Sequence, residues 1–435
     1  MREELPRRLG LATASLLVIA SMVGTGVFTT TGLMVEDLRS DGAVLLAWAV
    51  GGLAALFGAL AYAELTAALP HNGGEYQLLT RIYHPAVGFI AGVVSLVVGF
   101  SAPIAASAIA FGEYFARIVP GTPPIASALV LVTTLSVLHA AHVRGGGGVQ
   151  NVFAAGKALL IAGFITAGLL AADVTDLGEG ARPTARAVLS PDFAVSLIIV
   201  SFAYSGWNAA TYVAGEIRRP GHVLPRALVI GTLAVTGLYL LINVAFLIAA
   251  PHEVLAGHVE VGHVAAAHLF GEGAGRTLSA VIGLGLISTV GALIMTGPRV
   301  YEAMGRDHPR LRVLSWRTER SGPVISIALQ AALAVVMIVT STFEALLTYI
   351  GVVLAAVSAL TVAGVFVMRV RAPHLERPYR TWGHPLTSLA FIGLMVWMVV
   401  HTLLQRPLVA AAAAGTIAGA LAAYFPLRDR GNGPS

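Results

Sequence analysis

The stretch IASMVGTGVFTTTG, residues 19–32, places three glycines and several hydroxyl residues inside a long apolar run. A second stretch, SFAYSGWNAATYVAG at 201–215, has a similar mixture inside another apolar run. Glycine in a helix costs about 1 kcal/mol relative to alanine, and hydroxyl side chains compete for backbone hydrogen bonds. Small residues also let membrane helices pack closely, so one such stretch would be ambiguous. Two of them, five apolar runs apart, predict a pair of interrupted helices.

The composition is that of an integral membrane protein. The chain is 57% hydrophobic and 11% charged, with a mean hydropathy of +0.81, whereas soluble domains carry about 25% charged residues. A helix needs about 20 apolar residues to cross a hydrocarbon core of about 30 Å. Twelve such runs lie at about 11–35, 43–69, 86–116, 123–143, 150–172, 192–215, 226–250, 277–303, 322–342, 345–369, 386–404 and 408–426.

The order of these runs predicts an all-α membrane fold with one domain over 1–435. The connections are short, and MREELPRRLG leads into the first run without a cleavage site for a signal peptide. An offset of five spans gives the two interrupted helices opposite directions, as an inverted repeat requires. Glycine-interrupted segments at corresponding positions of two halves indicate a transporter site. We expect repeats at 11–172 and 192–369, with two trailing helices within 386–426.

The distribution of arginine predicts the orientation. With both termini in the cytoplasm, the inner segments hold 20 arginines and the outer segments hold six. Positive residues favour the cytoplasmic side, so this orientation is the expected one. The preference for Arg over Lys, with many Ala and Gly residues, suggests a GC-rich bacterial genome and therefore the inner membrane of a bacterial cell. No separate basic domain exists for a nucleic-acid partner.

Lys157 is the only lysine in the chain and lies inside the apolar run 150–172. Ionisable groups within a membrane span are candidates for functional sites by default. The alternative is a lysine whose ammonium reaches the membrane interface along its own flexible stem. Its depth, about one third into the run, favours a functional role.

The interrupted helices themselves predict a class of ligand. A break at mid-membrane frees N–H groups on one side and C=O groups on the other, and each costs several kcal/mol if it stays unpaired in hydrocarbon. A zwitterionic amino acid satisfies both kinds. Its carboxylate suits N–H groups at the start of a half-helix, where the dipole is positive, and its ammonium suits the freed carbonyls.

Five ordered motifs resemble those of the amino acid–polyamine–organocation (APC) superfamily, close to the L-type amino acid transporter light chains and their bacterial relatives. The resemblance covers nearly the whole chain. The motifs are VGTGVF (23–28), AYAELTAALPHNGGEYQLL (61–79), VQNVFAAGKALL (149–160), FAYSGWNAATYVAGEIRRPGHVLPRAL (202–228) and ERPYRTWGHPLT (376–387).

The resemblance implies a LeuT-like fold of twelve spans, with two inverted five-helix repeats, two trailing helices, and spans one and six unwound at mid-membrane. It also implies a substrate site built from backbone groups. The carboxylate would meet the N–H groups of Val23, Gly24, Thr25 and Gly26. The ammonium would meet carbonyls near Ile19 and Ala20 and those of Phe202, Ala203 and Ser205.

Further roles follow from the same resemblance. Phe202 would cover the bound substrate with its ring, although an aromatic that only packs against neighbouring helices is the plain alternative. Lys157 would replace a sodium ion, bridging carbonyls near Ala20 and the hydroxyls of Ser288 and Thr289. Burial lowers the pKa of a lysine, so proton coupling through the same group stays open.

Other polar residues carry weaker predictions. Glu64 and Glu75 flank an inner boundary where they could pair as a gate with Arg218, Arg219 and Arg226, but we expect solvated loop charges. The histidines of the outer segment lack the spacing of a metal site, and no cofactor is expected. They are His252, His258, His263 and His268.

The sequence therefore predicts a permease for small or medium neutral L-amino acids, working by sodium-independent exchange or facilitated diffusion. A proton-coupled amino acid symporter is the alternative, and an organic cation or polyamine transporter is a weaker one, because acidic residues are scarce near the expected pocket. Gly206 stands where arginine/agmatine exchangers of this superfamily place a glutamate. No catalytic cluster indicates an enzyme. Without cysteine, a disulfide-linked heavy chain has no attachment point, whereas a homo-oligomer stays open.

Overall fold

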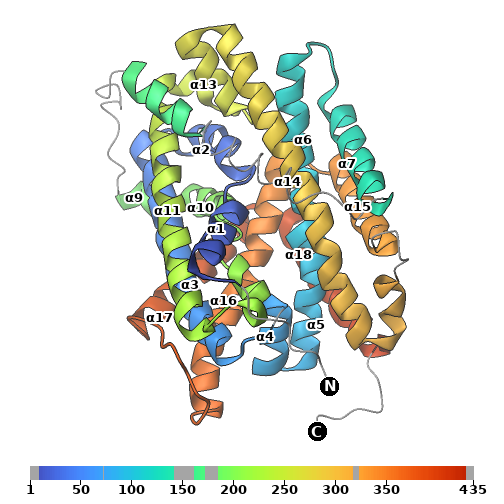
Figure 1. Cartoon of the computed structure of the whole chain (residues 1–435). Coiled ribbons are helices and arrows are strands. Elements are labelled where there is room, and N and C mark those ends of the chain that lie inside the picture. Colours follow the sequence, from blue (N-terminus) through green and yellow to red (C-terminus); the bar gives the residue numbers. More distant parts are fainter. Residues whose placement is uncertain (1–8, 72, 142–160, 172–184, 317–322, 428–435) are drawn as a thin grey trace.

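The computed structural model describes residues 9–71, 73–141, 161–171, 185–316 and 323–427 (Figure 1). Within these ranges the regular structure is helical, and the only β-type pairing is an isolated bridge between Leu9 and Ile217. The predicted all-α class is confirmed. Lys157 lies outside the described residues.

Eight described helices are long and apolar enough to cross a membrane, judged by length and composition. They are α3 (Asp41–Ala68), the continuous helix Pro85–Ile118, α7 (Pro124–Ala141), α11 (Pro220–Ala249), α14 (Glu272–Asp307), α16 (Phe343–Arg371), α17 (Leu386–Gln405) and α18 (Pro407–Leu427). Shorter apolar helices are α1 (Leu11–Met22), Ile161–Ala171, α10 (Pro191–Ala203), α13 (Val261–Phe270) and α15 (Val324–Thr340).

Two of the shorter helices, α1 and α10, end inside their apolar runs. After α1, residues 23–25 are non-helical and a short 3-10 turn η1 (Gly26–Phe28) leads to α2 (Thr31–Leu38). After α10, residues 204–208 form turns before the 3-10 segment η4 (Ala209–Glu216). We call residues 23–25 the first break and residues 204–208 the second break.

Several helix boundaries differ from the sequence prediction. The run predicted at 226–250 begins at Pro220, because proline is tolerated in the first turn of a helix. The run predicted at 277–303 extends over 272–307. The helix Pro85–Ile118 consists of α5 (Pro85–Val94), a π-helical segment η2 (Ser95–Ser101) that the sequence analysis did not predict, and α6 (Ala102–Ile118).

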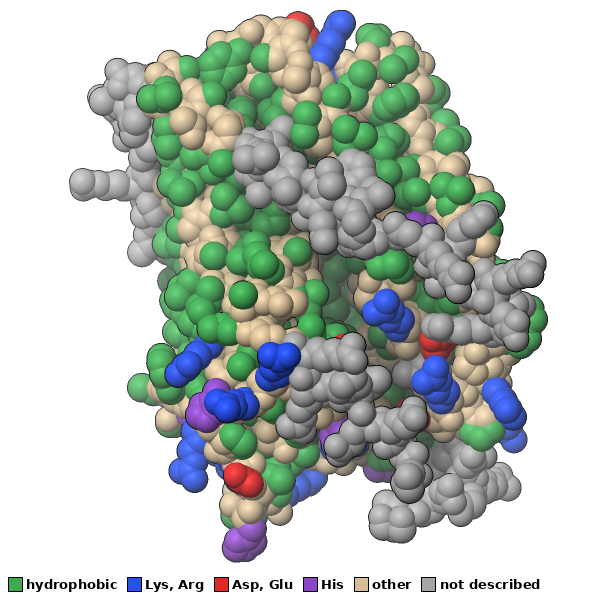
Figure 2. Space-filling view, in the orientation of Figure 1, with side chains coloured by type: hydrophobic (Ala, Val, Ile, Leu, Met, Phe, Trp, Pro, Cys, Tyr) green, Lys and Arg blue, Asp and Glu red, His purple; other side chains and the backbone are tan. Residues whose placement is uncertain are grey.

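The two broken segments lie at the centre of the helix assembly (Figure 1). There α1 packs against α11, and α10 packs against α3, α16 and α17. The outer helices expose large apolar side chains, among them Val130 on α7 and Leu408 on α18, as expected of surfaces that face lipid. Figure 2 shows hydrophobic side chains over the flank of the molecule and basic side chains gathered toward its lower end.

Candidate functional site

The two breaks touch each other through glycines. A Cβ placed on Gly26 would lie 2.5 Å from the Cα of Ala203, the last residue of α10. A Cβ on Gly206 would lie 2.6 Å from the carbonyl oxygen of Ser21, on the last turn of α1. Gly206 also has a φ of +98°, in the region that favours glycine. Only glycine lets the two main chains approach this closely.

The first break presents backbone N–H groups. Within the described chain, no acceptor pairs with the N–H groups of Gly24, Thr25 or Gly26. The N–H of Val23 is used differently, because it donates to the carbonyl of Ile19 at 2.9 Å. The Thr25 side chain is fixed by a hydrogen bond of 2.5 Å between its hydroxyl and that of Ser107. Three consecutive donors at the start of the helical segment that follows the first break form an arrangement that suits an anion.

The carbonyls at the ends of α1 and α10 share one donor. The Tyr239 hydroxyl of α11 lies 2.5 Å from the Met22 carbonyl and 3.0 Å from the Ala203 carbonyl. The Phe202 carbonyl accepts from the N–H of Ser205. Tyr239, which the sequence analysis did not single out, therefore joins the two broken helices from a third one.

Of the carbonyls predicted to hold an ammonium, two lack a donor in the described chain. They are those of Ala20 and Ser205, whereas the carbonyls of Ile19, Phe202 and Ala203 are paired within the protein. The Phe202 side chain is buried, 6% exposed. Since residues 19–32 and 201–215 contain no charged side chain, the breaks offer main-chain dipoles and uncharged side chains alone.

We expect Tyr239→Phe to weaken both the junction and transport. The substitution removes one hydroxyl and leaves two buried carbonyls without their donor, which costs about 1–3 kcal/mol. The melting temperature in detergent should fall, and reconstituted uptake should slow. Tyr349→Phe is the matched control, since its hydroxyl contacts Thr416 between α16 and α18. A Tyr239→Phe protein as stable and active as the control would contradict this role.

A small cavity separates the first break from α14. Its volume is about 10 Å³, about the space of one water molecule, and its lining includes Gly24, Phe28, Gly285 and Thr289. Ser288 is half-buried on the same helix. Of the two predicted partners of Lys157 on α14, Thr289 therefore lies next to the first break, while Lys157 itself falls outside the described residues.

The prediction that Glu64 is a solvated loop charge is wrong. Its side chain is 2% exposed and receives two hydrogen bonds from Arg369 at 2.9 and 2.7 Å. The N–H and hydroxyl of Thr381 donate to the same carboxylate, each at 2.7 Å, and Arg377 lies 3.6 Å away. Arg369 lies in the last turn of α16, and Arg377 and Thr381 lie in the segment after it. Tertiary packing brings them to Glu64, which sequence distance does not reveal.

The prediction of a solvated loop charge is also wrong for Glu75. It lies in α4 (Gly74–Ile82) and is 6% exposed. The Tyr62 hydroxyl and the Asn208 amide donate to its carboxyl group. Neither acid forms an ion pair with Arg218, Arg219 or Arg226, the arginines considered from sequence.

The opposite end of the molecule carries its own polar contacts. Arg117 pairs with Glu260 at 2.5 Å, and His258 lies 3.2 Å from the same carboxylate. The Tyr114 hydroxyl donates to the Phe28 carbonyl at 2.6 Å, which ties this end to the first broken segment. Within the described ranges, no group of three His, Asp or Glu residues could hold a metal ion.

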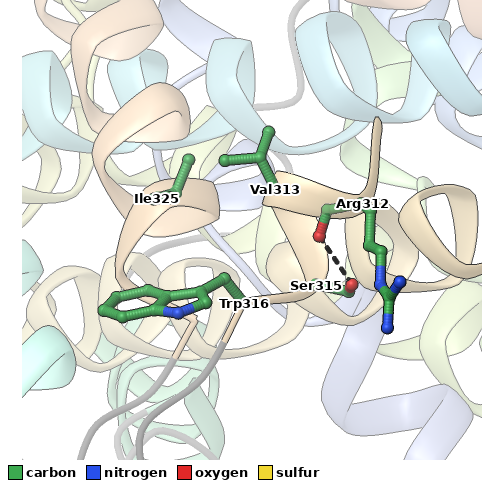
Figure 3. Close-up of a pocket in the computed structure, with 5 residues that line it drawn as sticks. All are labelled: Arg312, Val313, Ser315, Trp316 and Ile325. Atoms are coloured by element: carbon green, nitrogen blue, oxygen red, sulfur yellow. Dashed lines mark hydrogen bonds between the residues drawn. The ribbon is translucent and has the colours of Figure 1, made fainter. Parts of the chain in front are cut away.

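A hollow on the surface is lined by residues other than those of the breaks (Figure 3). It has a volume of about 740 Å³ and lies between η5 (Pro309–Ser315) and α15. Figure 3 shows the Trp316 ring along one side and the Arg312 guanidinium turned away. Because Trp316 precedes residues outside the described ranges, this hollow is not assigned a function.

Comparison with known proteins gives one family. The family model described as "Amino acid permease" matches residues 9–420. The b(0,+)-type amino acid transporter 1 of Mus musculus is 30% identical, covering 93% of this chain and 83% of the relative. The large neutral amino acids transporter small subunit 2 of Homo sapiens is 28% identical, over 97% and 80%. The serine/threonine exchanger SteT of Bacillus subtilis (strain 168) is 29% identical over 92% of both chains.

Proposed function

This chain belongs to the amino acid permease family within the APC superfamily, and from that premise we propose that it carries small or medium neutral L-amino acids across a membrane by alternating access. The observation that carries the proposal is the meeting of the two breaks, with unpaired N–H groups at Gly24, Thr25 and Gly26. The family is one of membrane transporters, and the names of these relatives describe amino acid transport rather than enzymatic activity.

We propose the LeuT-like arrangement for the whole chain: one domain over 1–435, twelve spans, inverted repeats at 11–172 and 192–369, and two trailing helices within 386–426. The equivalent placement of the two breaks, after helices of 12 and 13 residues, supports it. Both termini would be cytoplasmic, in a bacterial inner membrane, as the arginine distribution favours.

The substrate site would use both broken helices. Gly24, Thr25 and Gly26 would bind the carboxylate through their N–H groups. The carbonyls of Ala20 and Ser205 have no donor at present and would accept from the ammonium directly. The other predicted groups would contact the substrate only after their present hydrogen bonds break: the carbonyls of Ile19, Phe202 and Ala203 and the N–H of Val23. Phe202 would cover the bound molecule.

A neutral side chain on the substrate fits the absence of charge at the breaks. Gly206 supports this choice over a cationic substrate, because its positive φ and its contact with Ser21 leave no room for a glutamate side chain. Names of the relatives agree with such a class, since they include large neutral amino acids and serine/threonine.

Sodium-independent exchange or facilitated diffusion is the proposed mode, with proton symport as the alternative. Lys157 would occupy the place of a sodium ion beside Ser288 and Thr289. The chain lacks cysteine, so no disulfide to a second subunit is proposed, although the human relative is named as a small subunit.

Reconstitution into liposomes tests this function. Uptake of labelled neutral L-amino acids is measured while internal amino acid, sodium and the pH gradient are varied separately. Exchange predicts stimulation by internal amino acid without a requirement for sodium or a pH gradient. Accumulation driven by an acid exterior would instead establish symport, and the absence of any amino acid flux would refute the proposal.

Lys157→Ala should impair transport in either mode. Removing a tethered ammonium from an apolar run leaves its partner dipoles without a charge, whether that charge replaces sodium or carries a proton. We expect the initial uptake rate to fall at least about tenfold, a loss of about 1.4 kcal/mol in transition-state stabilisation. Normal uptake by the variant, at equal protein content, would remove Lys157 from the mechanism.

A further inference from the structure

Glu75 is a carboxyl group buried in protein without a cation. It is 6% exposed, and its Oε1 atom accepts from the Tyr62 hydroxyl at 2.5 Å and from the Asn208 amide at 3.2 Å. Within the described chain, no Arg or His forms an ion pair with it, in contrast to Glu64 with its two arginines. A buried carboxylate without a cation is costly, so such groups shift toward the neutral, protonated form.

The carboxyl joins three elements at one end of the molecule. Tyr62 comes from α3, Glu75 from α4, and Asn208 from the end of the second break, two residues after Gly206. The connection is reinforced by the N–H of Gly73, which donates to the Tyr212 carbonyl of η4 at 3.2 Å. Any movement of η4 away from α3 must therefore open the surroundings of Glu75.

The groups that face Glu75 are uncharged, so burial has the dominant effect on the pKa of its carboxyl group. They are the hydroxyl of Tyr62 on α3, the amide of Asn208, and the ring of Tyr212 on η4. Thr361 and Ser358 of α16 adjoin the Tyr62 hydroxyl. The position in the first turn of α4 favours the anion, as do the two hydrogen bonds, but burial outweighs them and raises the pKa of Glu75.

We propose that Glu75 is a proton-binding site whose occupancy controls opening of the cytoplasmic side of the second broken helix. When protonated, the neutral carboxyl remains buried between α3, α4 and η4. When ionised, it needs water, and η4 and α4 separate from α3 to admit it. The proton returns to the side from which it came, so this control needs no net proton movement and is compatible with exchange. The inference rests on the alternating opening proposed above.

The difference in the pKa of Glu75 between the two states determines how pH shifts the ratio of open to closed molecules. In the open state, where water reaches the carboxyl, its pKa should be ordinary, and in the closed state burial raises that pKa. The closed state is favoured below both values. Between them, each pH unit shifts the ratio of open to closed molecules by up to about tenfold toward open, and above the raised value the ratio becomes constant.

The cysteine-free chain provides a direct readout of this opening. Thr361 is fully buried on α16, beside the Tyr62 hydroxyl, so Thr361→Cys places a single thiol behind the closed contact. Its labelling rate with N-ethylmaleimide is measured in liposomes from about pH 5.5 to about pH 8.5. The same thiol in a Glu75→Gln background supplies the matched reference, because the ratio of the two rates cancels the pH dependence of the thiol.

The proposal predicts that this ratio rises with pH, by up to about tenfold for each pH unit below the raised pKa of Glu75, and then levels off. Glu253→Gln, at an exposed acid at the other end, should leave the rise intact. A ratio independent of pH overturns it. If Glu75→Gln does not give a monodisperse protein, Glu75→Asp replaces it in the test. Glu75→Asp should shift the pH midpoint of the labelling curve, and an unchanged midpoint overturns the proposal. Labelling that responds to amino acid but not to pH would refute this inference alone, whereas absence of amino acid flux would refute the proposed function.

Discussion

Gly206→Ala should reduce transport at least about tenfold, because the added methyl group would force the two breaks apart. An alanine Cβ would lie 2.6 Å from the Ser21 carbonyl oxygen, closer than any real contact, and would sit on a residue with φ of +98°. The left-handed region costs a non-glycine residue about 1–2 kcal/mol even without a clash. The second break must therefore move away from α1 or change its turn, and either change separates the groups that form the site.

Initial uptake rates in liposomes, normalised to the amount of monodisperse protein, check this expectation. Gly237→Ala is the matched control, because it lies within α11 and its added Cβ meets no atom within 4 Å. Alanine is also the better helix former, so this control should transport like the parent. Uptake by Gly206→Ala at more than about half of the parental rate would show that the contact between the breaks is dispensable.

Glu64→Ala should be the most destabilising of the side-chain substitutions. Its carboxylate is the common acceptor for Arg369 and Thr381, with Arg377 3.6 Å away and 8% exposed. Removing one partner of a buried ion pair typically costs about 3–5 kcal/mol, because the remaining charge stays buried and unpaired. We expect a clear fall in the melting temperature in detergent and loss of the tie between α3 and the segment after α16.

Glu344→Ala is the control for this prediction. Its pair with Arg406 is exposed on both sides, at 36% and 42%, and exposed pairs contribute about 0–1 kcal/mol. Glu64→Gln should lie between the two, since the amide keeps acceptor capacity but not the charge. Equal melting temperatures for Glu64→Ala and Glu344→Ala would mean that the buried network contributes little to stability.

Local sequence patterns predicted the helical class and directed attention to both breaks. Glycine and hydroxyl residues at 24–32 and glycine at 206 act through backbone conformation, which is a local property. The structure ends α1 at Met22 and α10 at Ala203, within those stretches. Composition likewise indicated membrane helices, because the hydrophobic length needed to cross a bilayer is a local property too.

Side-chain partners were the part that sequence could not supply. Tyr239 lies in an ordinary apolar run, and only the packing of α11 brings its hydroxyl to Met22 and Ala203. Glu64 and Glu75 are 11 residues apart, yet Glu64 meets Arg369 at the end of α16 and Arg377 beyond it, whereas Glu75 meets Asn208 of the second break. A charged residue near a predicted helix boundary is expected to be solvated, because the sequence does not show which distant elements pack around it.

The central claim is that backbone groups of two broken helices bind both ends of a free amino acid. Competition for uptake by capped substrates tests it most directly. For a neutral L-amino acid that the reconstituted protein transports, the account predicts that its methyl ester, which lacks the carboxylate, and its N-acetyl derivative, which lacks the ammonium, each inhibit at least about a hundredfold more weakly than the free amino acid. Inhibition by either capped form at the same concentration as the free amino acid would contradict the claim.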